Sequence, residues 1–237
     1  MAAERTAGSA QAALLLFGSC LPVLGAVLIA PVLPRMHAHF AETPGVAVLV
    51  PVALTLPALV IALLAPLAGV LADRVGRRAL LLASMLLYSL CGLLPLWLDS
   101  LVLIVASRAG IGLAEAGIMT CCTTLMGDYF DGQRRARLFA LQMVVTSLAA
   151  ALFMGVGGAL GESDWRTPFT LYAVGALCLP LMALLLWEPR ACQTATRAAA
   201  SPSRCSTWPP ARPARWPRRW PRTPVPRTPS TPTATST

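Results

Sequence analysis

The chain has 237 residues, of which 56% are hydrophobic and only 12% are charged, and its mean hydropathy is +0.66. A soluble domain carries about 25% charged residues, so this composition excludes an ordinary soluble fold and indicates a chain surrounded by lipid. The net charge of +9 does not indicate a nucleic-acid partner, because the chain up to and including Arg190 holds 11 arginines and 10 acids, whereas 8 arginines and no acid follow it.

Six apolar segments follow one another, each long enough to cross a bilayer as a helix of about 20 residues. They run from about Ala12 to Pro34, Val46 to Leu71, Ala79 to Leu98, Leu101 to Leu125, Leu138 to Leu160 and Phe169 to Trp187. Only Asp99 and Ser100 separate the third segment from the fourth, which predicts an antiparallel hairpin. We therefore predict an all-α membrane protein in which residues 12–188 form one bundle of six transmembrane helices, after an N-terminus at residues 1–11.

The arginines between these segments predict the orientation, because short positively charged loops stay in the cytoplasm. With the N-terminus inside, the outer side holds only Arg35 and Arg166. The cytoplasmic side then holds Arg5, Arg74, Arg77, Arg78, Arg134, Arg135 and Arg137. We expect a multi-pass integral protein of a bacterial inner (plasma) membrane, with both termini in the cytoplasm and membrane lipids as partners.

Prolines and glycines mark special positions inside the segments. Pro51, Pro57 and Pro66 lie in the second segment, where they predict bends, because neighbouring helices can bond the carbonyls that proline leaves free. Small residues let helix backbones approach closely, and we assign such a packing role to Gly112, Gly155, Gly157, Gly158 and Gly161.

A dense charged turn, Gly69-Val-Leu-Ala-Asp-Arg-Val-Gly-Arg-Arg78, separates the second and third segments. Gly69 would let another helix approach, Asp73 could pair with an arginine or a helix dipole, and Gly76 would permit a tight turn. The arginines that would anchor this turn on the cytoplasmic side are Arg74, Arg77 and Arg78.

This string resembles the loop between the second and third helices of major facilitator superfamily transporters. The pattern there is a Gly, an aliphatic residue, Ala, Asp, Arg, any residue, Gly and two basic residues. The resemblance implies a secondary transporter, whose loop gates opening by contacting the second half of the molecule.

Arg108 and Glu115, in the fourth segment, are the only charges deep inside any apolar run. An ionised side chain near the bilayer centre costs about 2.5–3.5 kcal/mol, so both must face protein or water. Seven residues apart, they share one helical face at about 10.5 Å along the axis, so we expect a third group or a water between them. Arg108 could bind an anionic group of a substrate and Glu115 could carry a proton. The alternative is a structural ion pair or network between helices.

Two further resemblances point to different substrates. The stretch from Arg108 to Gly117 resembles the superfamily's fourth-helix pattern, and its Glu-Ala pair looks like branches that move organic anions, sugar phosphates or lipids. The stretch from Leu24 to Pro34 resembles the first helix of drug-proton antiporters. However, Phe153 and Met154 stand where the antiporters' fifth-helix motif carries Gly-Pro, so the sequence leaves the substrate open.

No catalytic residue, metal site or cofactor is predicted. The seven cysteines form no CxxC pair, and five of them lie inside apolar runs as small core residues. His37 and His39 lie in a loop without the partners that a metal site needs. An intramembrane protease would need a histidine inside the membrane and a Gly-x-Ser-Gly sequence, and neither is present.

Residues 189–237 have a different composition, dominated by Pro, Arg, Ala, Thr and Ser, which cannot form a core and predicts a disordered low-complexity tail. One interpretation is a cationic segment at residues 212–222 that lies on the anionic inner leaflet. The interpretation we favour is the out-of-frame product of a GC-rich gene, because the change falls where the central loop of such a transporter begins.

The sequence therefore indicates the N-terminal six-helix half of a truncated secondary transporter of small solutes, either proton-coupled or facilitative. Its partner would be a second six-helix half or another copy of the chain in a homodimeric half-transporter. The alternative is a six-helix membrane fragment that does not transport and serves in assembly or regulation.

Overall fold

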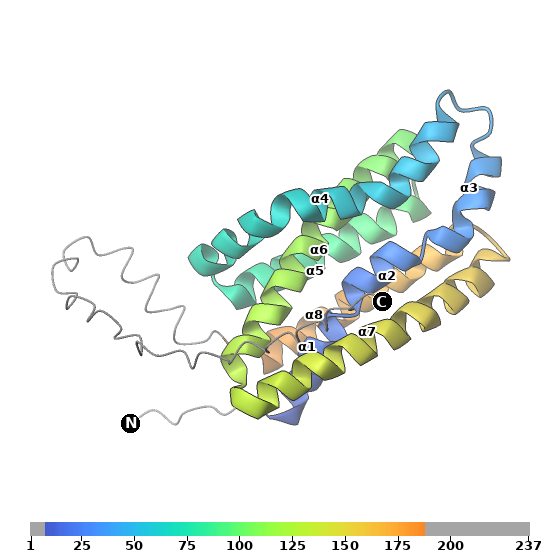
Figure 1. The fold of residues 1–237 in the computed structure, drawn as a ribbon. Coiled ribbons are helices and arrows are strands. Elements are labelled where there is room, and N and C mark those ends of the chain that lie inside the picture. The colour runs from blue at the N-terminus through green and yellow to red at the C-terminus, as the bar shows by residue number, and fades with distance from the viewer. Residues whose placement is uncertain (1–7, 188–237) are drawn as a thin grey trace, which may run out of the picture. The chain divides into compact units, whose positions relative to one another are not determined.

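The computed structural model describes residues 8–187, which form a bundle of helices (Figure 1). Predictions for residues 1–7 and for the tail at 189–237 lie outside the described residues. The elements in chain order are α1 (Ser9–Gly18), α2 (Leu21–Val27), η1 (Ala30–Val32), α3 (Leu33–His39), α4 (Val46–Val75), α5 (Arg77–Leu93), η2 (Leu94–Leu96), α6 (Leu101–Tyr129), α7 (Gly132–Gly161), η3 (Thr167–Tyr172) and α8 (Ala173–Leu185).

Six helical spans within the described residues are long and apolar enough to cross a membrane. These spans are Ser9–His39, Val46–Val75, Arg77–Leu96, Leu101–Tyr129, Gly132–Gly161 and Thr167–Leu185. The described part of the chain contains no strand. The predicted fold class, an all-α membrane protein with six transmembrane helices, is confirmed.

The first span is interrupted twice, although its sequence is a nearly unbroken apolar run. Proline lacks the N–H that continues a helical ladder, and the interruptions lie beside Pro22 and Pro31. One carbonyl near the first break finds a side-chain donor, because the Tyr88 hydroxyl donates to the Leu21 carbonyl oxygen at 2.7 Å. The short helix α2 is therefore held by neighbouring helices as well as by its own ladder.

The charged turn is mostly helical. The helix α4 runs without a break to Val75 and α5 starts at Arg77, so Gly76 is the single residue between them. Gly76 has φ +106°, a conformation that side-chain-bearing residues rarely adopt, which explains the need for glycine here. The three prolines of the second segment lie inside α4.

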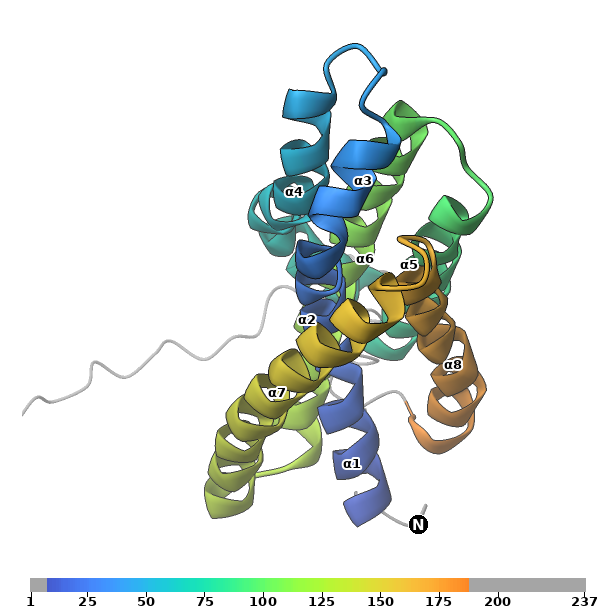
Figure 2. The ribbon, with the colours of Figure 1, turned by 90° about the vertical axis from the view of Figure 1, so that its right-hand side faces the viewer.

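The helix α6 is the centre of the bundle, and the first span and α6 are the most buried of the six. The helix α4 packs along α6, where a Cβ added to Gly112 would lie 2.7 Å from the Pro57 carbonyl oxygen. The helix α7 crosses α1 and α2 obliquely (Figure 2), with Gly157 next to Leu28. A Cβ added to Gly155 would meet no atom within 4 Å.

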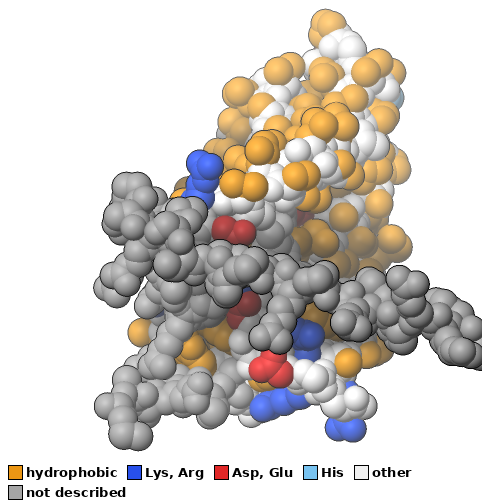
Figure 3. Space-filling view, turned by 60° about the vertical axis from the view of Figure 1, so that its left-hand side comes forward, with side chains coloured by type: hydrophobic (Ala, Val, Ile, Leu, Met, Phe, Trp, Pro, Cys, Tyr) orange, Lys and Arg blue, Asp and Glu red, His pale blue; other side chains and the backbone are white. Residues whose placement is uncertain are grey.

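Charged side chains gather at the near end of the described bundle in Figure 3, and hydrophobic ones dominate the visible surface beyond it. At the end that holds the charged turn, Arg77 pairs with Asp128 at the end of α6. At the other end, Arg166 pairs with Asp99, and Arg35 donates to the carbonyls of residues 161 and 162. An apolar band between two polar rims matches the layers of a bilayer.

Candidate functional site

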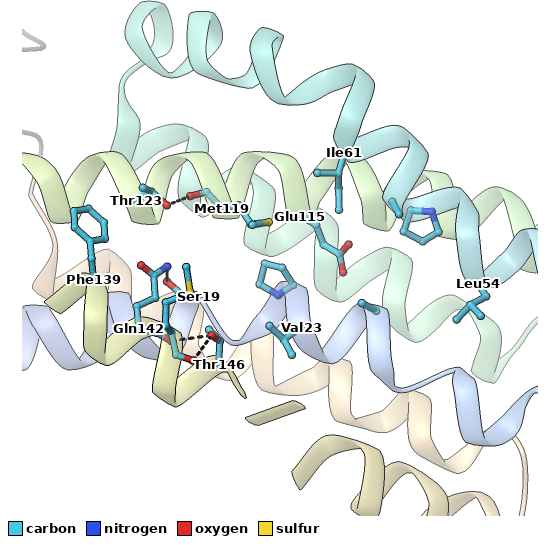
Figure 4. A pocket seen from close by; sticks show the side chains of 15 residues that line it. Ser19, Val23, Leu54, Ile61, Glu115, Met119, Thr123, Phe139, Gln142 and Thr146 are labelled. Atoms are coloured by element: carbon cyan, nitrogen blue, oxygen red, sulfur yellow. Dashed lines mark hydrogen bonds between the residues drawn. The ribbon is translucent and has the colours of Figure 1, made fainter. Parts of the chain in front are cut away.

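A cavity of about 550 Å³ lies among α2, α4, α6 and α7 (Figure 4). Prolines and aliphatic side chains of α2 and α4 form two of its walls. Its polar lining is small and comes from the other elements, consisting of Ser19, Glu115, Thr123, Gln142 and Thr146. This volume falls in the range of about 300–1,000 Å³ that is typical of sites for drug-sized molecules.

Most polar groups of the cavity are satisfied within the protein. The Gln142 amide donates to Ser19 Oγ at 3.0 Å, and Ser19 Oγ donates to the Leu15 carbonyl at 2.8 Å. The hydroxyls of Thr123 and Thr146 each donate to a carbonyl of their own helix at 2.8 Å. Each of these hydroxyl oxygens retains acceptor capacity toward the cavity, since a hydroxyl has two lone pairs.

Glu115 differs from these residues. Its side chain leaves α6 toward α2 (Figure 4) and is only 1% exposed, yet Oε1 has no hydrogen-bond partner among the described residues. The carboxylate lies against Gly25, where an added Cβ would be 1.8 Å from Oε1. The contact leaves no room for a side chain at position 25. A buried carboxylate oxygen without a donor is costly, and it can take a proton or a donor group from a bound solute.

Arg108 is fully buried, two turns from Glu115 on α6. Its guanidinium carbon lies 4.8 Å from the Phe169 ring centre and 5.4 Å from that of Tyr172, which places the cation against two aromatic faces. Nη1 donates to the Tyr172 hydroxyl at 2.8 Å, whereas Nε and Nη2 have no partner in the part of the chain described. The two remaining donors are available to an anionic or carbonyl group.

Tyr172 connects the surroundings of the two charges. Its hydroxyl accepts from Arg108 and forms a long hydrogen bond of 3.5 Å to the Gly25 carbonyl, while Glu115 lies against the same glycine. Arg108 and Glu115 make no direct ion pair within residues 8–187. Tyr172 of η3 therefore contacts Arg108 directly, and it reaches Glu115 only through the α2 backbone at Gly25.

The charged turn forms a network with α6 and α8. Arg77 pairs with Asp73 at 3.2 Å and with Asp128, and Arg78 donates to the Ala183 carbonyl. Arg74 is exposed and has no ion pair or hydrogen bond with any described residue. No described atom lies within 4 Å of a Cβ added to Gly69, so this face of α4 is open.

Other candidate groups behave as packing residues. Within residues 8–187, no group of three or more His, Cys, Asp or Glu side chains is arranged to hold a metal ion. The His39 ring lies 4.8 Å from that of Phe40 and 5.3 Å from that of Trp165, at the rim of the bundle. The cysteines of the described residues are free thiols.

Sequence reasoning missed several residues of the site. Tyr172 and Tyr88 carried a signal, because a tyrosine inside an apolar run has a hydroxyl that needs a partner. Gln142 carried a similar signal as the amide side chain of the fifth segment. Gly25 carried none beyond its place in the Leu-Gly pair of the first segment, because its role depends on contact with a residue ninety positions away.

These features define a polytopic α-helical membrane protein with a solute-sized cavity between its helices. The family model of the Major Facilitator Superfamily matches residues 15–229, and the chain belongs to this superfamily. The match reaches into the segment that sequence analysis interpreted as an out-of-frame product.

Curated proteins with similar sequences have names that refer to drug resistance. The chain is 35% identical to the class C tetracycline resistance protein of Escherichia coli over 159 residues, which are 65% of this chain and 39% of that protein. It is 29% identical to the class H protein of Pasteurella multocida over 177 residues, 74% of this chain and 44% of that protein. It is 25% identical to the quinolone resistance protein NorA of Staphylococcus aureus over 181 residues, 76% of this chain and 46% of that protein. The chain thus spans less than half the length of these relatives.

Proposed function

We propose that the chain forms the N-terminal half of a secondary transporter that moves amphipathic, drug-sized solutes across a bacterial inner membrane and couples this movement to protons. The observation that carries the proposal is the unpartnered Glu115 carboxylate at the wall of a largely apolar cavity of about 550 Å³. Glu115 takes either a proton or the polar group of the solute, and this competition couples the two.

Two lines of support favour an amphipathic solute. The cavity wall is built mainly from proline and aliphatic side chains, which suit fused rings, with few polar groups to orient them. The relatives named for tetracycline and quinolone resistance carry names of such compounds. Arg108 carries a positive charge, opposite to that of Glu115. We assign to Arg108 the binding of an anionic or carbonyl group of a solute that reaches the rings of Phe169 and Tyr172.

The charged rims support one orientation of the bundle in the membrane. We propose that the end with Arg77 and Asp128 faces the cytoplasm, because the arginines of the α4–α5 turn and of the start of α7 lie there. The most apolar stretch of α7 contains no buried residue, and that of α4 contains few buried residues, although both helices border the cavity. We place a second six-helix half on the sides of α4 and α7 that border the cavity. The charged turn would gate opening by contacting that second half.

A drug-accumulation assay tests the proposal. Cells that lack their own resistance transporters would express the chain, and tetracycline and quinolone accumulation would be followed by fluorescence, with and without a proton gradient. We expect Glu115→Gln to reduce proton-dependent efflux because it weakens solute binding by about 10- to 150-fold, the factor that corresponds to a charged hydrogen bond of about 1.5–3 kcal/mol. The matched control is Glu162→Gln, which changes an exposed carboxylate just after the end of α7, outside the cavity.

Binding by the purified chain separates a half-transporter from a complete one. Glu115-dependent binding without transport would assign the chain as a half that needs a partner. The proposal would be refuted if the chain showed no Glu115-dependent binding and no Glu115-dependent transport. Pairing of two copies through α7 is the alternative partnership, and cross-linking of single cysteines placed at the exposed Leu148 would detect it.

A further inference from the structure

A second hollow lies on the described bundle, away from the cavity with Glu115. This α4–α5 groove has a volume of about 300 Å³, and its lining includes Leu64, Leu67 and Leu71 of α4, Leu80 and Leu87 of α5, and Leu113 of α6. It shares no lining residue with the larger cavity. Leu113 is 48% exposed even though it belongs to the most buried long helix of the bundle. The groove therefore opens the centre of the bundle to its surroundings.

The charged turn closes one end of this groove. Leu64, Leu67 and Leu71 follow one another on α4 at helical spacing, and Arg74 comes three residues after Leu71 and seven after Leu67. With 3.6 residues per turn, Arg74 lies on the same face of α4 as the leucines, one turn beyond them. The helix continues to Val75, so this register holds through Arg74.

Arg74 differs from the other two arginines of the turn. Arg77 is paired with Asp73 and Asp128, and Arg78 donates to a carbonyl of α8. Arg74 is exposed without a partner in the described residues. An apolar stripe that leads to an unpaired cation has the polarity of a phospholipid, with its acyl chain and its anionic headgroup in the same order.

The surroundings of the groove support the same occupant. The groove lies between two helices that are long and apolar enough to cross a membrane, so in a bilayer its apolar walls would meet hydrocarbon chains. A lone cation at the polar end adds selection by headgroup, because an arginine near the surface attracts anionic lipid. A zwitterionic lipid would fill the groove equally well, but its ammonium group would offset the attraction of its phosphate to Arg74.

We propose that the α4–α5 groove binds one anionic phospholipid, with an acyl chain between α4 and α5 and the headgroup phosphate on Arg74. In the orientation proposed above, this lipid belongs to the cytoplasmic leaflet. The site needs neither the solute cavity nor transport. It places a lipid next to the charged turn, so that lipid composition acts directly on that turn.

Native mass spectrometry of the purified full-length chain in detergent tests the proposal. The chain would be titrated with phosphatidylglycerol and with phosphatidylethanolamine of identical acyl chains. We expect one phosphatidylglycerol to bind more tightly than phosphatidylethanolamine. Arg74→Gln should weaken phosphatidylglycerol binding about fivefold, which corresponds to about 1 kcal/mol for one arginine, and should remove the preference. Leu67→Trp should fill the groove and weaken both lipids.

Matched variants separate a built site from general attraction. Arg135→Gln removes an exposed arginine from the same rim, and Leu59→Trp adds the same ring to an exposed position of α4 outside the groove. Both should leave the first phosphatidylglycerol unchanged. If Leu67→Trp fails to fold, as judged by circular dichroism, Ala83→Leu fills the groove from α5. Equal losses in Arg74→Gln and Arg135→Gln, or binding indifferent to both groove-filling variants, would overturn the proposal.

Discussion

Gly25→Ala is the sharpest test of the arrangement around Glu115. The added methyl group would lie 1.8 Å from Glu115 Oε1 and 3.0 Å from its carboxyl carbon. Carbon and oxygen atoms in contact stay more than 3 Å apart, so the carboxylate must move by more than 1 Å or α2 must shift away from α6. Overpacking of this kind costs about 1–3 kcal/mol. A helical alanine regains about 0.5–1 kcal/mol over glycine, which offsets part of this cost.

A double-mutant cycle isolates the contact. In a Glu115→Ala background the clash disappears, and the nearest remaining atom of those around the added methyl is Ile111 Cγ2 at an ordinary 3.6 Å. Gly25→Ala should then be neutral or stabilising by up to about 1 kcal/mol. The expected coupling between positions 25 and 115 is about 1–3 kcal/mol, well above the deviation of about 0.5 kcal/mol found for independent sites.

The assay is equilibrium unfolding of the four variants in mixed micelles, followed by far-ultraviolet circular dichroism. Gly155→Ala is the matched control, because no described atom lies within 4 Å of its added Cβ, and it should not destabilise the protein. A coupling below about 0.5 kcal/mol would show that the Glu115 carboxylate does not lie against α2. The same destabilisation in both backgrounds would attribute the effect of Gly25→Ala to another neighbour.

Three further experiments probe the site and the turn. Tyr172→Phe removes the hydroxyl that accepts from Arg108 and should lower unfolding stability by about 1.5–3 kcal/mol, measured by thermal unfolding in micelles. Charge-removing substitutions at Arg77 and Asp128, whose side chains are 19% and 23% exposed, should show a coupling of about 0.2–1 kcal/mol that decreases between low and high salt. Gly76→Ala forces a side chain into φ +106° and should cost about 1–3 kcal/mol in the same unfolding assay.

Each of these has a control in the same region. Thr170→Val removes an exposed hydroxyl near Tyr172, and a loss as large as that of Tyr172→Phe would mean that the Arg108 bond is not responsible. A salt-independent coupling at Arg77 and Asp128 would contradict a partly solvated ion pair. Gly69→Ala introduces the same residue into α4 with no neighbour within 4 Å, so stability should fall only for Gly76→Ala.

The sequence predicted the six helices because each apolar run matches the thickness of a bilayer, a constraint that acts locally along the chain. It also predicted a turn at Gly76, since glycine between two apolar helices indicates a special backbone angle. Helix ends were less predictable. Both α4 and α7 extend into charged residues, to Val75 and from Gly132, because arginine is a good helix former and the end of a membrane helix lies in water.

The contacts around Arg108 could not be predicted in the same way. Periodicity placed Arg108 and Glu115 on one face of α6, and the cost of burying a charge required partners for both. Which partners these are depends on how η3 and α2 pack against α6, and many pairings satisfy the same apolar pattern. Tyr172 is 64 residues from Arg108, and Gly25 is 147 residues from Tyr172, so no local signal connects them.

Because the first span is interrupted, the short helix α2 connects the wall of the solute cavity with the surroundings of Arg108. One side of α2 carries Leu21 and Gly25, whose carbonyls accept from Tyr88 and Tyr172, two rings that lie 5.0 Å apart. The other side carries Pro22, Val23 and Ala26, which line the solute cavity. A short helix held by side-chain hydrogen bonds moves more easily than a long one held by its own ladder. In the function proposed above, a solute that presses on α2 would act on Tyr172, and through its hydroxyl on Arg108, without touching either residue.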